Sequence, residues 1–314
     1  MKTQTEKMSE VVLIIIYNHQ YNKNIEILEQ IYKDRFSNIY HLIPFYTGDK
    51  KNVIPVYECS YHFQGYVSQG FKSYFKDEYK HYFFVADDLI LNPVINENNY
   101  TQHLKLNANT SFLPEIISLH QRKDFWSHII GAFRWNINFP GVEAKNQLPD
   151  YDTALQMFAK FGIEIKPLRY LHLFKKQEFP GLLKIKKMKS YFLWERRLYK
   201  NRNREFHLSY PLVSAYSDIF VISAESIKKF SHYCGVFAST KLFVEVAVPT
   251  SLVLSSSEIV TEKDLKLQGK ALWTKEQFQI LDKYEERLNL LLNYFPENHL
   301  YFHPIKLSKW NTEL

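Results

Sequence analysis

Two adjacent aspartates, Asp87 and Asp88, follow a run of aromatic and β-branched residues at 82–85. Such a run is typical of a short buried strand, so both carboxylates fall at the carboxyl end of a strand. Neighbouring carboxylates repel each other and lose hydration there unless a cation compensates. Mg²⁺ and Mn²⁺ bind carboxylate oxygens, and open α/β sheets bind ligands at this end of their strands. The pair therefore favours a metal site for a phosphorylated substrate, with an ordinary strand-to-turn transition as the alternative.

Two further carboxylates stand in apolar surroundings. Asp218 lies in the strand-like stretch 209–223, and Glu245 is the only charged residue between Leu242 and Leu254. A carboxylate in such a setting is paired or functional, and a raised pKa would suit contact with a substrate hydroxyl. The alternative for Glu245 is a carboxylate satisfied by a nearby Lys, Arg or backbone group.

Near the end of the printed sequence, His303 is followed three residues later by Lys306. Imidazole is a suitable ligand for Mn²⁺, and the ammonium group of a lysine suits a departing diphosphate. A histidine on the surface without a function is the alternative.

The elements that must position these residues alternate between strands and helices. Strands are predicted by apolar runs, and helices by apolar residues at helical spacing. The predicted strands are 11–17, 39–46, 53–57, 82–85 and 209–223; the predicted helices are 24–36, 65–80, 150–161, 224–234 and most of 265–293. Residues 92–109 are predicted to form a surface loop. This alternation favours an α/β domain with a mostly parallel, Rossmann-like sheet flanked by helices.

Composition narrows the class of protein further. Apolar residues make up 46% of the chain, enough for a packed core, and the nine glycines argue against glycine-rich phosphate loops. A formal charge of +7 fits an anionic partner such as a nucleotide diphosphate, a lipid surface or nucleic acid. Cys59 and Cys234 form no Cys-x-x-Cys pattern, which argues against zinc ribbons and disulfide dependence. The apolar run at 11–17 is too short to span a bilayer.

A basic, aromatic-rich insertion is predicted at 166–206, with its Lys and Arg residues concentrated in 175–204. Such a segment can lie on an anionic membrane, contact an anionic acceptor or bind nucleic acid, or it can be a solvated helical face.

The segment Val85-Ala-Asp-Asp-Leu89 resembles the Asp-x-Asp region of GT-A-fold glycosyltransferases, which use nucleotide-sugar donors. The longer string 83–93 is similar to a segment of exostosin-like enzymes and of bacterial capsule and lipopolysaccharide glycosyltransferases. Ala86 stands where that motif has its first aspartate. The ending 301–310 resembles the closing segment of some metal-dependent members, although the spacing differs and a glycine is missing.

This resemblance implies one GT-A-like domain over 1–314 that moves a sugar from a nucleotide-sugar, with a UDP-sugar as the expected donor, to a hydroxyl of a glycan or lipid-linked glycan. Asp88, Asp87 and His303 would hold Mn²⁺ or Mg²⁺, and Lys306 would contact the diphosphate. Tyr17 ends the first strand and Asn18 begins the loop after it, where the nucleotide base would bind, and Asp87 could also contact the donor. Glu245 or Asp218 would act as base on the acceptor, or would orient the sugars in a retaining enzyme.

These expectations place the protein in the cytoplasm, with peripheral contact to the inner face of the membrane through 175–204 and no nucleic-acid partner. A different class of function remains open at this point. The chain could be a glycosyltransferase-like module that binds glycans or a membrane without turnover, an alternative that the Ala86 departure supports. A nucleic-acid-binding protein that uses 175–204 is a third hypothesis, and it predicts steeply salt-dependent binding.

Overall fold

The computed structural model of the 314-residue chain describes residues 9–122, 131–169, 200 and 204–314. Its central sheet has seven strands in the order β12-β6-β11-β4-β1-β2-β3. The first four strands in sequence are parallel: β1 (Val11–Ile16), β2 (Ile39–Pro44), β3 (Val53–Val56) and β4 (His81–Ala86). β11 (Ile219–Ser223) runs antiparallel to both of its neighbours, β4 and β6 (Thr110–Phe112). The predicted α/β class with a mostly parallel sheet is confirmed.

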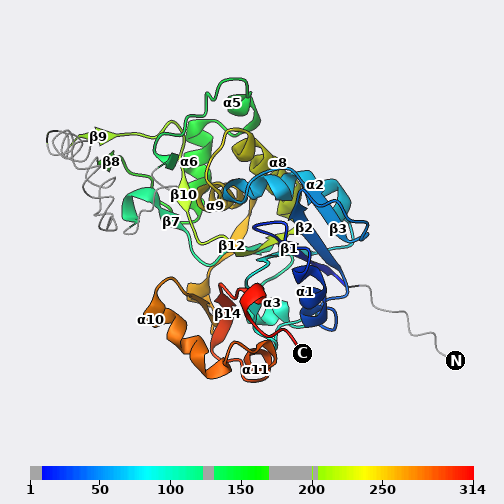
Figure 1. Ribbon diagram of the computed structural model, residues 1–314. Helices are drawn as coiled ribbons and strands as arrows, with labels where there is room; N and C mark the ends of the chain where they lie inside the picture. The colour runs from blue at the N-terminus through cyan, green and yellow to red at the C-terminus, as the bar shows by residue number, and fades with distance from the viewer. Residues whose placement is uncertain (1–8, 123–130, 170–199, 201–203) are drawn as a thin grey trace, which may run out of the picture.

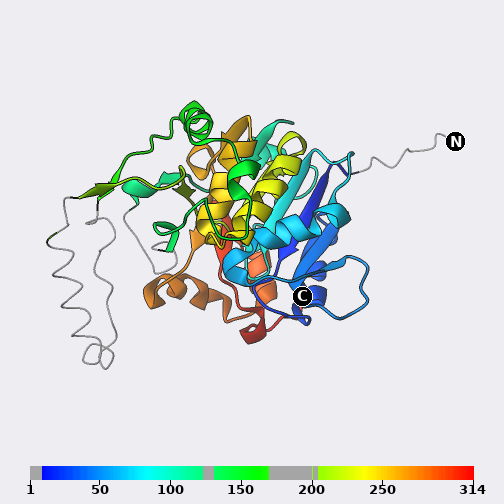
Figure 2. The same cartoon turned by 90° about the horizontal axis from the view of Figure 1, so that it is seen from above.

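Helices cover both faces of this sheet, which makes three layers (Figure 1). All six residues of β1 are buried, because alternate side chains point into opposite layers. Val12 and Ile14 join the core beneath α2 (Gln64–Tyr74), α8 (Ala224–Ser239) and α9 (Val244–Ser255). Val11 and Leu13 join the core that includes α1 (Asn24–Tyr32) and the C-terminal segments. Figure 2 shows α2, α8 and α9 lying across the strands.

The order of the strands reverses beside β1. The chain runs outward from β1 to β2 and β3 on one side, and then returns to place β4 on the other side of β1. The carboxyl ends of β1 and β4 therefore meet at a topological switch point, which is where open α/β sheets bind their ligands.

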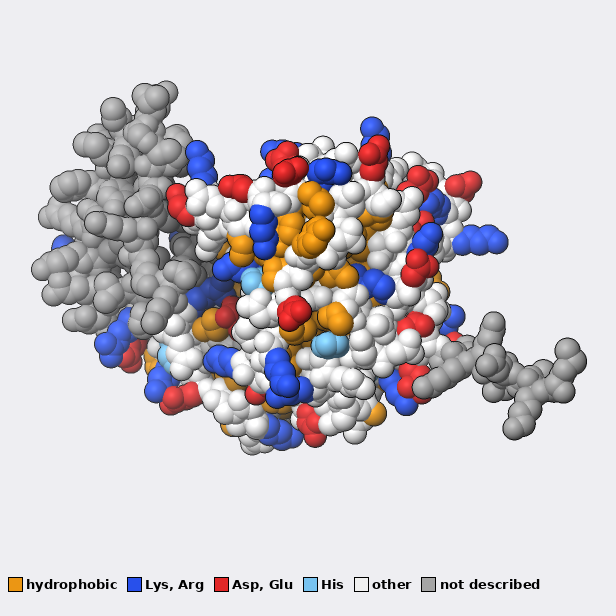
Figure 3. All heavy atoms as spheres, turned by 90° about the horizontal axis from the view of Figure 1, so that it is seen from below, with side chains coloured by type: hydrophobic (Ala, Val, Ile, Leu, Met, Phe, Trp, Pro, Cys, Tyr) orange, Lys and Arg blue, Asp and Glu red, His pale blue; other side chains and the backbone are white. Residues whose placement is uncertain are grey.

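A smaller sheet in the C-terminal layer has the order β13-β14-β5. Its strands are β13 (Gln268–Ala271), β14 (His299–His303) and β5 (Ile90–Leu91). The prediction that most of 265–293 is one helical stretch was only partly right. Two short helices, α10 (Lys275–Phe278) and α11 (Leu288–Asn293), and a 3-10 helix at Gln279–Tyr284 lie there, but the range also contains strand β13. Leu residues in this range pack singly into the core, which gave a false helical period. Figure 3 shows the face of this layer, where hydrophobic side chains gather near the centre and charged side chains mostly surround them.

Other parts of the chain complete the layers. The expected surface loop at 92–109 contains α3 (Tyr100–His103), and its Ile95 and Leu104 are buried in the core. The remaining helices and strands are β7 (Ile117–Ser118), α5 (Ala144–Gln147), α6 (Tyr151–Lys160), β10 (Val213–Ser214) and β12 (Glu258–Val260). β8 (Leu168–Arg169) and β9 (Glu205–Phe206) form a two-stranded antiparallel ladder at the two ends of the predicted insertion 166–206. Most of the insertion lies outside the described residues. Among the helices that the structure describes, none is both long and apolar enough to cross a membrane.

Candidate active site at the carboxyl edge of the sheet

The two aspartates that follow β4 point to different partners. Asp87 is buried, 2% exposed, and its carboxylate accepts hydrogen bonds from the Asn18 amide and from Asn24 Nδ2, both at 3.2 Å. The Asp88 side chain is 24% exposed and its Oδ1 faces His303 Nε2 at 3.1 Å. Both residues lie in the turn that follows β4, and the turn directs their side chains toward different partners.

His303 reaches Asp88 through the smaller sheet. β14 runs antiparallel to β5 with Phe302 opposite Ile90, so the next residue of β14 lies beside the turn that carries Asp88. The Ile305 amide donates to the Asp88 carbonyl at 2.7 Å and fixes this approach. A residue 215 positions away in sequence is thereby held against the end of β4.

Asp218 arrives from the other side. β11 pairs antiparallel with β4, with Ile219 opposite Val85, and the Ala86 amide donates to the Asp218 carbonyl at 2.8 Å. Its carboxylate Oδ2 lies 3.9 Å from His303 Nε2. Three segments that are distant in sequence thus bring Asp88, Asp218 and His303 together at one edge of the sheet.

The electrostatics of this group favour a cation. Burial, with the neighbouring Asp88 carboxylate, raises the pKa of Asp87 to about 7. Burial also raises the pKa of Asp218, to which Asp88 adds while His303 opposes it. Burial alone would lower the pKa of His303, but the carboxylates of Asp218 and Asp88 outweigh it and the pKa is raised. Three carboxylates therefore share one imidazole, and a second positive charge at this edge would stabilise all of them.

The spacing of Asp88 and His303 is compatible with a divalent metal ion. Ligands of one octahedral ion with bonds of about 2.1 Å lie about 3.0 Å apart when adjacent and about 4.2 Å apart when opposite. The 3.1 Å separation between Asp88 Oδ1 and His303 Nε2 lies close to the first value, whereas the 3.9 Å separation to Asp218 Oδ2 lies between the two. Asp88 Oδ1 is buried and accepts no hydrogen bond of good geometry, which is a group that a cation would satisfy. Asp88 and His303 would be the best-placed ligands, and Asp218 would have to move closer to Asp88 to join them.

Aromatic rings surround this cluster. Tyr216 stacks on Tyr301 with ring centroids 5.7 Å apart, and its ring centroid lies 5.6 Å from that of His303. The ring centroid of Trp273 lies 5.7 Å from that of His303, and the Trp273 side chain is 63% exposed. An exposed indole beside a metal site is a suitable stacking surface for a sugar ring. Sequence reasoning missed Trp273 because it lies in a range that was predicted to be helical.

Two exposed aromatic residues lie further along the same edge. Phe45 follows β2, Tyr57 follows β3, and their ring centroids lie 5.9 Å apart. Phe45 is 56% exposed and has a φ of 55°, a strained conformation for a bulky residue. Strain of this kind gathers at functional sites, and adjacent strands lie about 4.8 Å apart, so the end of β2 is about 10 Å from the end of β4. The signal in the sequence was only two aromatic residues at predicted strand ends.

The other predicted residues lie apart from this cluster. Glu245 is in the first turn of α9, is 15% exposed and faces Arg122 at 3.6 Å. The Glu245 carbonyl accepts a hydrogen bond from the Ala215 amide at 2.9 Å. The short segment 215–218 therefore connects the start of α9 to Asp218 in the cluster. Arg122, which the sequence analysis did not select, also donates to Ser214 Oγ at 2.9 Å.

Tyr17 is fully buried and its hydroxyl lies 2.9 Å from His41 Nδ1, so the structure gives it a core contact instead of a surface for a base. Asn18 is half-buried and holds Asp87. Lys306 is exposed, and its contact with a diphosphate stays a prediction. Two hollows among the described residues lie away from the aspartates; the larger, about 210 Å³, is lined by residues such as Gln121, Phe161 and Lys263.

Comparison of the sequence with models of protein families and with curated proteins gives no match.

Proposed function

We propose that the protein is a metal-dependent glycosyltransferase that moves a sugar from a nucleotide-sugar, a UDP-sugar in our proposal, to a hydroxyl of a glycan or lipid-linked glycan. The observation that carries the proposal is the convergence of Asp88, Asp218 and His303 at the topological switch point of an open α/β sheet. This is the edge at which such sheets bind nucleotides, and the donor set suits the cation that accompanies a diphosphate.

Mn²⁺ or Mg²⁺, when bound, would neutralise the charge that develops on the departing nucleotide diphosphate. Asp88 and His303 would hold it, with Asp218 as third ligand. His303 must lose its proton to ligate, since only neutral imidazole offers a lone pair. Lys306, three residues along, would contact the diphosphate as a point charge.

Asp87 is a positioning residue in this proposal. Its hydrogen bonds to Asn18 and Asn24 tie the end of β4 to the loop after β1. That loop borders the switch point, so Asp87 would fix its position relative to the end of β4.

Different aromatic residues would contact the base and the sugar of the donor. Phe45 and Tyr57 would offer a stacking surface to the base, about 10 Å along the edge from the metal ligands. Trp273 would pack against the sugar beside His303.

Glu245 would act on the acceptor hydroxyl. With Asp218 engaged at the metal, Glu245 is the carboxylate that remains for this role, and Arg122 would hold it in place. It would serve as general base if the enzyme inverts, or would orient the acceptor if it retains.

Turnover tests the proposal. We expect Mn²⁺-dependent hydrolysis of a nucleotide-sugar by the purified chain, because glycosyltransferases transfer slowly to water when no acceptor is present. Asp88→Asn should lower the rate at least about 100-fold, the size of a lost electrostatic contact to a transition state. The control Asp34→Asn changes an exposed aspartate and should leave the rate unchanged. Binding of the nucleotide-sugar without any turnover, with an acceptor library present, would favour the non-catalytic binding module instead.

The membrane contact expected of 175–204 stays a prediction, because nearly all of that segment lies outside the described residues. The cytoplasmic location also stays a prediction. Binding of the protein to vesicles that contain anionic lipid, compared with neutral vesicles, would test the first of them.

A further inference from the structure

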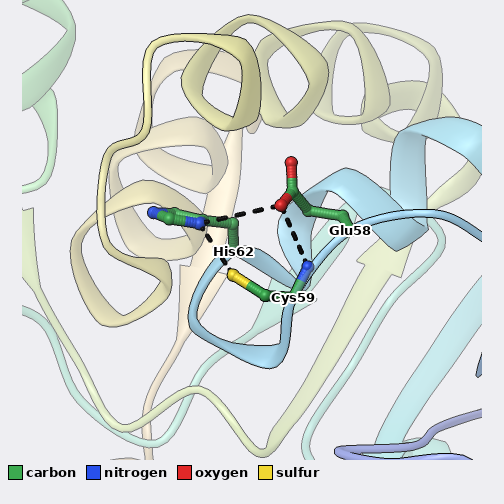
Figure 4. Close-up of side chains that lie close together, drawn as sticks. All are labelled: Glu58, Cys59 and His62. Atoms are coloured by element: carbon green, nitrogen blue, oxygen red, sulfur yellow. Dashed lines mark hydrogen bonds and ion pairs between the residues drawn. The ribbon is translucent and has the colours of Figure 1, made fainter.

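A second group of metal-binding side chains lies where β3 leads into α2. Glu58, Cys59 and His62 place one ligand atom each within 4.8 Å of the other two (Figure 4). Cys59 Sγ lies 3.1 Å from His62 Nδ1, and Glu58 Oε1 lies 3.9 Å from the same nitrogen. A 3-10 turn at Ser60–His62 begins directly after Cys59, and it brings His62 to the same side of the chain as Cys59.

The geometry distinguishes coordination from catalysis by a cysteine. In a relay of nucleophile, base and acid, the acid holds the ring nitrogen that the nucleophile does not use. Here the thiol and the carboxylate both face Nδ1, so the three donor atoms converge on one point (Figure 4). Convergence of a sulfur, a nitrogen and an oxygen is the arrangement that a shared cation needs.

We propose that Glu58, Cys59 and His62 bind a Zn²⁺ ion, separate from the metal of the proposed active site. A thiolate with an imidazole selects a borderline ion such as Zn²⁺ over Mg²⁺ or Mn²⁺. Tetrahedral Zn²⁺ with usual bond lengths places sulfur and nitrogen ligands about 3.6 Å apart, and nitrogen and oxygen ligands about 3.4 Å apart. The separations of 3.1 Å and 3.9 Å each need a change of about half an ångström, which side-chain rotation in an exposed turn supplies.

The surroundings prepare the carboxylate for this role. Lys241 Nζ contacts Glu58 Oε2 at 2.8 Å, and the Cys59 amide donates to Oε1 at 2.9 Å. Partial burial opposes ionisation, but these hydrogen bonds outweigh it and the pKa of Glu58 is lowered. Lys241 precedes α9 and thus supports a ligand from outside the coordination shell.

Zinc binding would release the Cys59 thiol proton to solvent and form one Zn–S bond, with no redox step. A fourth position would face solvent, since Cys59 is exposed, and water would occupy it. The ion would pin the connection between β3 and α2, which joins the same edge of the sheet as Tyr57 and Phe45.

Thiol alkylation of the full chain tests the site, because the sequence holds only two cysteines. Cys59 is exposed and Cys234 is fully buried, so native protein should react at Cys59 alone. Zn²⁺ should slow alkylation of Cys59 at least tenfold, since the metal-bound sulfur is withdrawn from reaction. Cys234 should react only in denaturant, which shows in each variant that the fold is intact.

His62→Gln and Glu58→Gln should each weaken this protection tenfold or more in zinc concentration, as loss of a ligand requires. The matched control His103→Gln, in α3 of the opposite layer, should retain it. Asp88→Ala should also retain it, which separates the two sites. Alkylation at the same rate with and without Zn²⁺, or full protection in folded His62→Gln, would overturn the proposal. Co²⁺ gives a second readout: a thiolate-to-metal absorption band that Cys59→Ser must abolish.

Discussion

Proton competition at His303 gives the sharpest prediction about the proposed active site. The imidazole of His303 lies between Asp88 and Asp218, with Nε2 3.1 Å and 3.9 Å from their carboxylate oxygens. A metal ion that binds there must displace the proton that the charged imidazole carries on Nε2. Because the two carboxylates raise the pKa of His303 above its ordinary value, this competition extends to higher pH than for an exposed histidine.

The magnitude follows from one proton per ion. In the pH range where His303 is protonated in the free protein, Mn²⁺ affinity should fall about tenfold for each unit by which the pH decreases. This corresponds to about 1.4 kcal/mol of binding free energy per unit. At lower pH the raised pKa of Asp218 makes the loss steeper, because a second ligand is then protonated. His303→Gln should bind Mn²⁺ more weakly but with a flatter pH dependence.

Mn²⁺ binding can be measured by titration calorimetry or by the magnetic resonance signal of free Mn²⁺, between about pH 5 and pH 7. A Cys59→Ser background removes the second proposed metal site. Asp88→Asn should weaken binding about 100-fold or more, at least the loss seen for outer-shell partners, and Asp34→Asn should not change it. Tight binding with no pH dependence, or unchanged binding by Asp88→Asn, would refute the assignment of these ligands.

Three further changes probe other parts of the account. Glu245→Gln should lower transfer to an acceptor about 100-fold or more while Mn²⁺ affinity stays unchanged, and equal loss of both would contradict its separate role. Phe45→Ala should weaken nucleotide binding by about 1–3 kcal/mol if the base stacks there, as measured by calorimetry against Tyr294→Ala, an exposed aromatic after α11. Burial lowers the pKa of His41 to about 4, below its unfolded value, so stability is complete above about pH 6.5 and is lost as pH falls toward 4. The loss should reach roughly 3 kcal/mol in urea denaturation, and His41→Gln should remove it; an unchanged pH profile in His41→Gln would contradict this reading.

Local patterns in the sequence were sufficient for the first part of the fold. The apolar run at 11–17 became β1, and the helical spacing after Asn24 became α1, because burial of alternate or of every third or fourth residue fixes each element locally. The aspartates at the end of β4 were found in the same way. Their division into a buried Asp87 and an Asp88 that faces His303 is a property of the folded turn after β4, and no local pattern predicts it.

The rest depends on contacts between distant segments. His303 reaches Asp88 only because β14 pairs with β5, and β5 is two residues long, too short to give a pattern of its own. Trp273 follows β13, whose strand is paired with β14 and not specified by its own sequence Gln268–Ala271. The strain at Phe45 is likewise a property of the folded turn. No period in the sequence reports such long-range pairing.

Thermal stabilisation by nucleotides would show whether a nucleotide-sugar binds at this edge of the sheet. Binding to the native state at about 100 times the dissociation constant contributes about 2.7 kcal/mol, which raises the melting temperature of a chain this size by several degrees. We predict that one UDP-linked species stabilises the wild type, that this requires Mn²⁺, and that Asp88→Ala abolishes it while Asp34→Asn retains it. No shift with any nucleotide or nucleotide-sugar, with or without Mn²⁺, would contradict a nucleotide-sugar site at this edge of the sheet.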